Sequence, residues 1–112
     1  MADSTWIARH CFARIAPRKA RLLIDLIRGE RCSTALEHLR FSHQRAARMI
    51  EAVLKSAMVN ADEAEANMAR LYVKEAFVDG ASYQRRWRPK DRGRVHPIAK
   101  RSSHINLVVA EG

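Results

Sequence analysis

The chain has 112 residues, of which 47% are hydrophobic and 29% are charged, a composition typical of a globular protein rather than a disordered one. Lys and Arg total 21 against 12 Asp and Glu, so the net charge is +9, which favours a polyanionic partner: nucleic acid first, an anionic membrane surface second. The apolar runs are too short to span a bilayer, so we expect no membrane association. This length predicts a single domain over residues 1–112.

Cysteines and histidines give no pattern of a metal or catalytic site. Cys11 and Cys32 lie too far apart in the sequence for a Cys-x-x-Cys pair, and the start of the chain resembles neither a secretory signal nor a transit peptide. We therefore expect an intracellular protein in which both thiols are reduced and buried. The five histidines lack ligand spacing, and no phosphate-binding loop or nucleophile motif is present. The sequence predicts no metal, no cofactor and no enzymatic activity.

The first elements in chain order are a strand and a helix. A period-two pattern predicts a strand from Trp6 to Ile15, with one face made by alternate residues: Ile7, Arg9, Cys11, Ala13 and Ile15. Pro17 suits the first position of a helix that runs to about Arg28, with Gly29 as its stop. An apolar stripe of Leu23, Ile24 and Ile27 would face the core.

Two more helices follow. Thr34 and Glu37 have the spacing of a capping box for a short helix ending near Arg40, and Ser42 can cap the next helix. That helix, from His43 to about Ala61, has the strongest pattern, because seven apolar residues fall on one face: Ala46, Ala47, Ile50, Val53, Leu54, Ala57 and Ala61. The acidic residues beyond it predict a solvated loop: Asp62, Glu63 and Glu65.

Two strands enclose a long polar segment in the last third of the chain. Leu71, Val73 and Phe77 alternate with Tyr72, Lys74 and other residues, and the same period returns in Ile105, Leu107 and Val109. The 26 residues from 79 to 104 have their midpoint beside Gly93, which predicts a long hairpin, with a disordered basic loop as the alternative. We expect the core at about 6–78 and 105–110 and the extended arm at about 79–104.

Most of the net charge lies on this arm. The 19 residues from Tyr83 to Arg101 hold eight basic residues and one acid, and six of the eight are arginine. Arginine binds phosphate through a planar fork, and rings among the arginines can stack on unpaired bases. Trp87 could equally close the base of the arm over the core. The candidate RNA-binding residues of this segment are Tyr83, Arg85, Arg86, Trp87, Arg88, Lys90, Arg92, Arg94, Lys100 and Arg101.

A second basic group lies around the start of the first helix, where acids are normally preferred. Its members are Arg14, Arg18, Lys19 and Arg21, for which phosphate contact competes with surface pairing to Asp25, Glu30 or Glu37. His104, at the root of the arm, either donates to a phosphate or is simply hydrogen-bonded at the start of a strand. From these residues alone, an architectural DNA-binding protein explains the charge as well as an RNA-binding one does. The sequence lacks the metal-binding or acid-base residues that a small nuclease would need.

Three separated motifs resemble the large-subunit ribosomal protein twenty-two family: Ala13–Leu22 (ARIAPRKARL), Leu71–Asp79 (LYVKEAFVD), and Arg92–Arg94 with Lys100–Ile105 (KRSSHI). The resemblance extends from about Trp6 to Val109. It implies an α+β fold, with a three-stranded antiparallel sheet packed on three helices and a long protruding β-hairpin. It also implies a cytoplasmic structural constituent of the large ribosomal subunit, which binds the large ribosomal RNA and is needed early in subunit assembly.

In that family the hairpin lines the peptide exit tunnel near the macrolide site. Its partners there are the nascent polypeptide and neighbouring proteins, including ribosomal protein four at the constriction. The matching tip in this chain is Arg88, Pro89, Lys90, Asp91, Arg92, Gly93 and Arg94. This chain departs from the family pattern at Asp91, which lowers the local charge. It departs again at His96 and Pro97, where proline removes a donor from the returning leg and argues against regular pairing.

Overall fold

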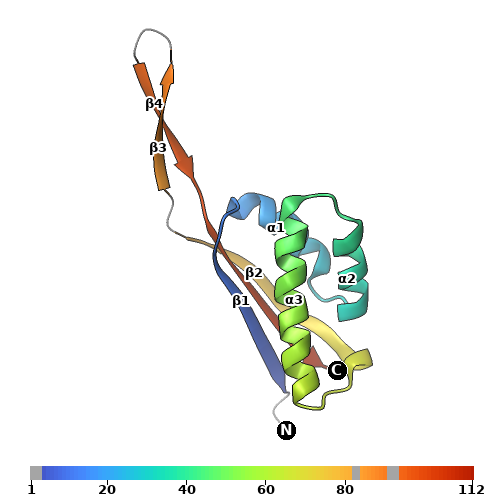
Figure 1. Ribbon diagram of the computed structural model, residues 1–112. Coiled ribbons are helices and arrows are strands. Elements are labelled where there is room, and N and C mark those ends of the chain that lie inside the picture. The colour runs from blue at the N-terminus through green and yellow to red at the C-terminus, as the bar shows by residue number, and fades with distance from the viewer. Residues whose placement is uncertain (1–3, 82–83, 91–93) are drawn as a thin grey trace.

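The structure is a computed structural model that describes residues 4–81, 84–90 and 94–112, with side chains described for 4–81 and 101–112. A first strand is followed by three helices, a single 3-10 turn and four further strands (Figure 1). The elements are β1 (Thr5–Ala13), α1 (Pro17–Ile27), α2 (Cys32–Phe41), α3 (Arg45–Glu63), η1 (Met68–Arg70), β2 (Leu71–Gly80), β3 (Gln84–Lys90), β4 (Arg94–Lys100) and β5 (Ser103–Glu111).

Three strands form one antiparallel sheet in the order β1-β5-β2, so the last strand along the chain lies in the middle. The three α-helices all pack on one face of this sheet (Figure 1). The free edge of β2 is partly covered by the turn after α1, because Gly29 donates to the carbonyl of Val73 and Val73 donates to the carbonyl of Glu30, each at 2.9 Å. The predicted α+β architecture is confirmed.

The core lies between the sheet and the helices. All seven apolar residues predicted on one face of the longest helix are buried in α3. The stripe of α1 is also buried, as are Ile105, Leu107 and Val109 of β5, each fully enclosed. Removing this much apolar surface from water is the main driving force for the fold.

The helix boundaries differ from prediction mainly at their caps. Gly29 has a φ of 83° and ends α1 as expected. Thr34 makes no capping box, because α2 begins at Cys32 after Arg31. Ser42 follows α2 rather than capping α3, and its hydroxyl donates to the carbonyl of His38 at 2.9 Å. α3 ends at Glu63, so its last turn includes two of the acids predicted to lie in a loop.

A bulge in β1 overturns the predicted face of this strand. The pairing of β1 with β5 shifts register between His10 and Ala13, and Phe12 has a φ of 56°. Ala8 is buried and Ile7 is exposed before the bulge, Cys11 within the bulge is exposed, and Ala13 turns inward after it. The prediction that Cys11 is buried was therefore wrong, since a one-residue slip exchanges the two faces of a strand.

A second bulge has the same effect in β2. The pairing of β2 with β5 shifts between Val73 and Glu75. Leu71 and Val73 face the core before it, whereas Ala76 and Val78 do so after it, and Phe77 is left 42% exposed. The period-two pattern grouped Phe77 with Leu71 and Val73 on one face, whereas the bulge places it on the opposite face.

β3 and β4 form the predicted antiparallel hairpin, which projects from one end of the sheet (Figure 1). Its register is continuous from Gln84 opposite Lys100 to Lys90 opposite Arg94. Pro97 lies opposite Trp87 within this ladder, so proline does not interrupt the returning leg. The predicted turn beside Gly93 lies outside the described residues. With the hairpin, the molecule measures 65 × 27 × 19 Å.

Candidate nucleic-acid interface

The candidate interface begins at the root of the hairpin, where β2 ends and β5 begins. Gly80 pairs with Ser103, and the main-chain N–H of Ala81 donates to the carbonyl of Ser102 at 3.0 Å. The main sheet therefore leads directly into the hairpin. Arg101, two residues before β5, is exposed at this root.

His104 is held by the bulge of β1. Its Nδ1 accepts a hydrogen bond from the main-chain N–H of Phe12 at 3.0 Å. The two rings meet edge to face with centroids 4.7 Å apart, a favourable arrangement for aromatic pairs. The simpler prediction for His104, a hydrogen-bonded histidine at the start of a strand, is confirmed. Because Nδ1 is an acceptor, Nε2 carries the proton of the neutral ring and remains a potential donor to a ligand.

The basic group at the start of α1 divides into two kinds of residue. Arg14, Arg18 and Lys19 are exposed, and within the described residues none of them forms an ion pair with an acid. Arg21 differs, because its Nε and Nη2 both donate to the carbonyl of Val78, at 3.1 and 2.9 Å. Arg21 thus joins α1 to the end of β2, just before the hairpin. Only part of its guanidinium remains for another partner.

Arg28 makes the same kind of contact seven residues further along the chain, although it was not among the predicted site residues. Its Nε and Nη2 donate to the carbonyl of Ala76 at 3.0 and 2.8 Å, and its Nη1 pairs with Asp25 at 2.9 Å. The seven-residue separation of Arg21 and Arg28, two turns of a helix, was the available signal. It could be interpreted only once β2 was known to lie beside α1.

The hairpin carries most of the remaining candidate residues. Arg85, Arg86, Trp87, Arg88 and Lys90 occupy positions in β3, and Arg94 and Lys100 mark the two ends of β4. Tyr83, Asp91, Arg92 and Gly93 lie outside the described residues. The register places Arg88 opposite His96 and Arg86 opposite Ile98. Basic positions are thus distributed along the ribbon rather than gathered at its root.

The basic elements share one end of the molecule. The hairpin, the end of β1 and the start of α1 lie together there, whereas the start of β1, the end of α3 and the C-terminus lie at the opposite end (Figure 1). The acids Asp62 and Glu63 form the last turn of α3. The electrostatic field is therefore polarised along the long axis, with its positive end toward the ribbon.

Other kinds of site find no support in the described residues. Within residues 4–81 and 101–112, whose side chains are described, no group of three or more His, Cys, Asp or Glu is placed to hold a metal ion. In the same ranges, no helix has the length and apolar character needed to cross a membrane. Burial raises the pKa of the Cys32 thiol to about 11, so this cysteine is protonated and unreactive at neutral pH.

A sheet backed by three helices, with a basic two-stranded ribbon leaving one end, defines a small α+β protein with an extended arm suited to a polyanion. The family model described as ribosomal protein L22p/L17e matches residues 8–110, and the chain belongs to this family. The resemblance inferred from the three motifs is confirmed.

Several relatives named large ribosomal subunit protein uL22 are similar over most of their length. The one from Geotalea daltonii is 44% identical over 105 residues, covering 93% of this chain and 95% of the relative. Those from Lactobacillus gasseri and Lactobacillus johnsonii are each 48% identical over 99 residues, covering 88% of this chain and 85% of the relative. The similarity thus includes both the core and the hairpin.

Proposed function

We propose that this chain is a structural constituent of the large ribosomal subunit that binds the large-subunit rRNA through its basic end. Its family makes it a ribosomal protein of the cytoplasmic large subunit, a class whose role is structural rather than enzymatic. The observation that supports RNA binding best is the β3–β4 hairpin, a ribbon with basic residues along both strands. We propose further that residues 1–112 act as one domain, a core with a single arm.

The charge of the arm supports RNA as its partner. Arginine side chains can each make paired hydrogen bonds to phosphate, and Tyr83 and Trp87 supply rings for stacking on unpaired bases. An isolated two-stranded ribbon is only marginally stable in water, so a partner that neutralises its charge would also fix its conformation. The exposed group of Arg14, Arg18 and Lys19 adds phosphate contacts at the same end of the core.

We infer that the hairpin tip, residues 88–94, lines the nascent-peptide exit tunnel. The family resemblance supports this position, and a narrow ribbon fits a crevice between RNA segments better than a flat surface. The neighbours implied are ribosomal protein four and the nascent polypeptide. The core, which stays outside the tunnel in this arrangement, would contact rRNA early in subunit assembly.

Sedimentation of ribosomal subunits tests the proposal. Epitope-tagged protein is expected to co-sediment with large subunits at moderate salt and to leave them only as salt is raised. A matched control is the same tagged protein added to an extract whose RNA has been digested, where the fast-sedimenting signal should disappear. Recovery of the tagged protein in the soluble fraction or on DNA would contradict the proposal.

A further inference from the structure

The corner between α2 and α3 is a second exposed surface, defined here as residues 40–45. Phe41, the last residue of α2, is 90% exposed, the largest value for any large hydrophobic side chain in the part of the chain whose side chains are described. Arg40, His43, Gln44 and Arg45 are also exposed. A nearly free phenyl ring among basic side chains is unusual on a protein surface, because such a ring normally packs against the core.

The charged side chains of the loop and of the adjoining helix turns, residues 38–50, are all basic, with Glu37 and Glu51 just outside this range. The sequence from His38 to Ile50 contains Arg40, Arg45 and Arg48 and no acid. Neither helix end supplies one either, since the first turn of α3 contains no acidic residue and the last turn of α2 is basic. The corner is therefore positive and suited to an anion.

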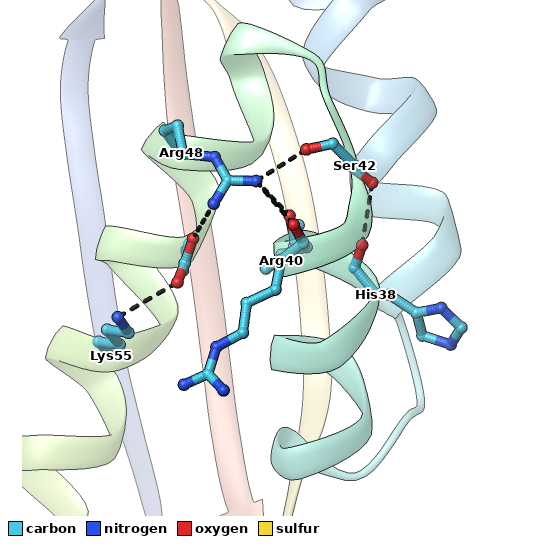
Figure 2. A network of polar contacts seen from close by, with 7 residues as sticks. His38, Arg40, Ser42, Arg48 and Lys55 are labelled. Atoms are coloured by element: carbon cyan, nitrogen blue, oxygen red, sulfur yellow. Dashed lines mark hydrogen bonds and ion pairs between the residues drawn. The ribbon is translucent and has the colours of Figure 1, made fainter.

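Arg48 binds the main-chain carbonyls at the end of α2, whose negative charge would otherwise repel an anion (Figure 2). Its Nη2 donates to the carbonyls of Leu39 and Ser42, each at 2.7 Å, and to that of Arg40 at 3.3 Å. These carbonyls form the negative end of α2. Because they turn toward Arg48, the corner does not present them to a ligand.

Glu51 completes this network from the next turn of α3. It accepts from Nη1 of Arg48 at 2.9 Å and pairs with Lys55 at 3.2 Å (Figure 2). Its side chain is only 12% exposed, so the carboxylate is engaged on both sides. In the same view the guanidinium of Arg40 extends away from the network. The loop is thus held in shape while its outer side chains remain available.

The corner lies at the basic end of the molecule. The start of α3 and the end of α2 lie at the end of the core from which the hairpin leaves (Figure 1). A ligand that follows the hairpin and the start of α1 would therefore reach residues 40–45 without crossing the acidic end of α3.

We propose that the α2–α3 corner is a separate RNA-contact surface, in which Phe41 stacks on an unpaired base and Arg40 and Arg45 bind the flanking phosphates. This proposal rests on the proposed rRNA binding of the chain and adds a contact that neither the hairpin nor α1 provides. RNA fits better than a protein partner, because basic side chains surround one isolated ring, whereas protein interfaces exclude charge from their apolar centre.

The test uses the full chain and a transcript of the large-subunit rRNA in filter-binding titrations. Phe41→Leu keeps an apolar side chain but removes the ring, and we expect it to weaken binding roughly 5- to 150-fold. Phe41→Tyr keeps the ring and is expected to bind as the unchanged protein does. Arg45→Gln should lower the slope of log affinity against log salt by about one.

Val59→Ala is the matched control, because Val59 lies near the other end of α3 and is 54% exposed. It should leave both affinity and slope unchanged. If the unchanged protein binds the transcript but Phe41→Leu and Arg45→Gln bind equally well, the corner proposal is overturned and the proposed function stands. If Phe41→Leu impairs only incorporation into subunits and not binding to the naked transcript, a protein partner replaces RNA at the corner. Failure of the unchanged protein to bind would instead overturn the proposed function.

Discussion

The hydroxyl of Ser103 donates to the main-chain carbonyl of Ile15 at 2.5 Å, and the Ser103 side chain is fully buried. This bond joins the first residue of β5, where the hairpin rejoins the sheet, to the turn between β1 and α1. The orientation of the hairpin root and the start of the basic helix are therefore coupled through one buried contact.

Ser103→Ala tests this coupling. The change leaves a buried carbonyl without its donor, which is expected to lower the free energy of unfolding by about 1–3 kcal/mol. Denaturant titration would measure it, with Ser56→Ala, at an exposed position of α3, as the control that should change stability by less than about 0.5 kcal/mol. Equal stability of the two variants would show that the bond contributes nothing.

Substitutions of Arg18 and Arg21 should have different effects, one on RNA binding and the other on stability. Arg21→Gln removes two hydrogen bonds to Val78 and should cost about 1–2 kcal/mol of stability. Arg18→Gln should leave stability within about 0.5 kcal/mol and lower the slope of log affinity for rRNA against log salt by about one. Denaturation and filter binding on both variants check this pair. The opposite assignment of effects would mean that Arg21 is the phosphate ligand.

The two cysteines should differ in reactivity. Cys11 is exposed and Cys32 is buried, so a thiol-modifying reagent should label one site in the folded protein and two after unfolding. Peptide mapping identifies the labelled residue. Labelling of Cys32 under native conditions would contradict its place in the core.

Cys32 also predicts a pH dependence of stability. Burial raises its pKa from 9.0 to about 11, so as pH rises the unfolded chain loses this proton first. The contribution of Cys32 is complete below pH 9 and is lost progressively as pH approaches 11. Denaturation across this range should show a steeper fall for the unchanged protein than for Cys32→Ala, which has no thiol to ionise. Parallel curves would refute this assignment.

Removing residues 88–94 tests the division of labour between core and arm. The main sheet, the helices and the Ser103 bond lie outside this segment, so we expect the core to keep its stability and the protein to be incorporated into large subunits. Subunit sedimentation and a structure of those subunits would measure incorporation and tunnel width. Loss of incorporation would show instead that the tip anchors the protein.

The sequence predicted most of the architecture because its strongest signals are local. The seven-residue face of α3 follows from helical period alone, and Pro17 and Gly29 mark the limits of α1 through their own backbone preferences. The basic residues of the hairpin were visible as a charge run, and the long polar segment between two strand patterns predicted the two legs that pair as β3 and β4. Each of these inferences needed no knowledge of a distant part of the chain.

The errors arose where distant parts of the chain decide the structure. The bulges in β1 and β2 depend on how both strands pair with β5, so period-two reading misplaced Cys11 and Phe77. The hydrogen bonds of Arg21 and Arg28 to carbonyls of β2 exist only because β2 lies beside α1. The corner at Phe41 was missed because one aromatic residue at a helix end looks like a core residue until its exposure is known.

The central place of β5 in the sheet also bears on the order of events during synthesis. In the described part of the chain, β1 and β2 pair with β5 and not with each other. A nascent chain that has emerged only as far as the hairpin therefore has two strands without their common neighbour. The core can close only after β5 has been translated, so folding of this protein is a late event that follows exposure of its basic arm.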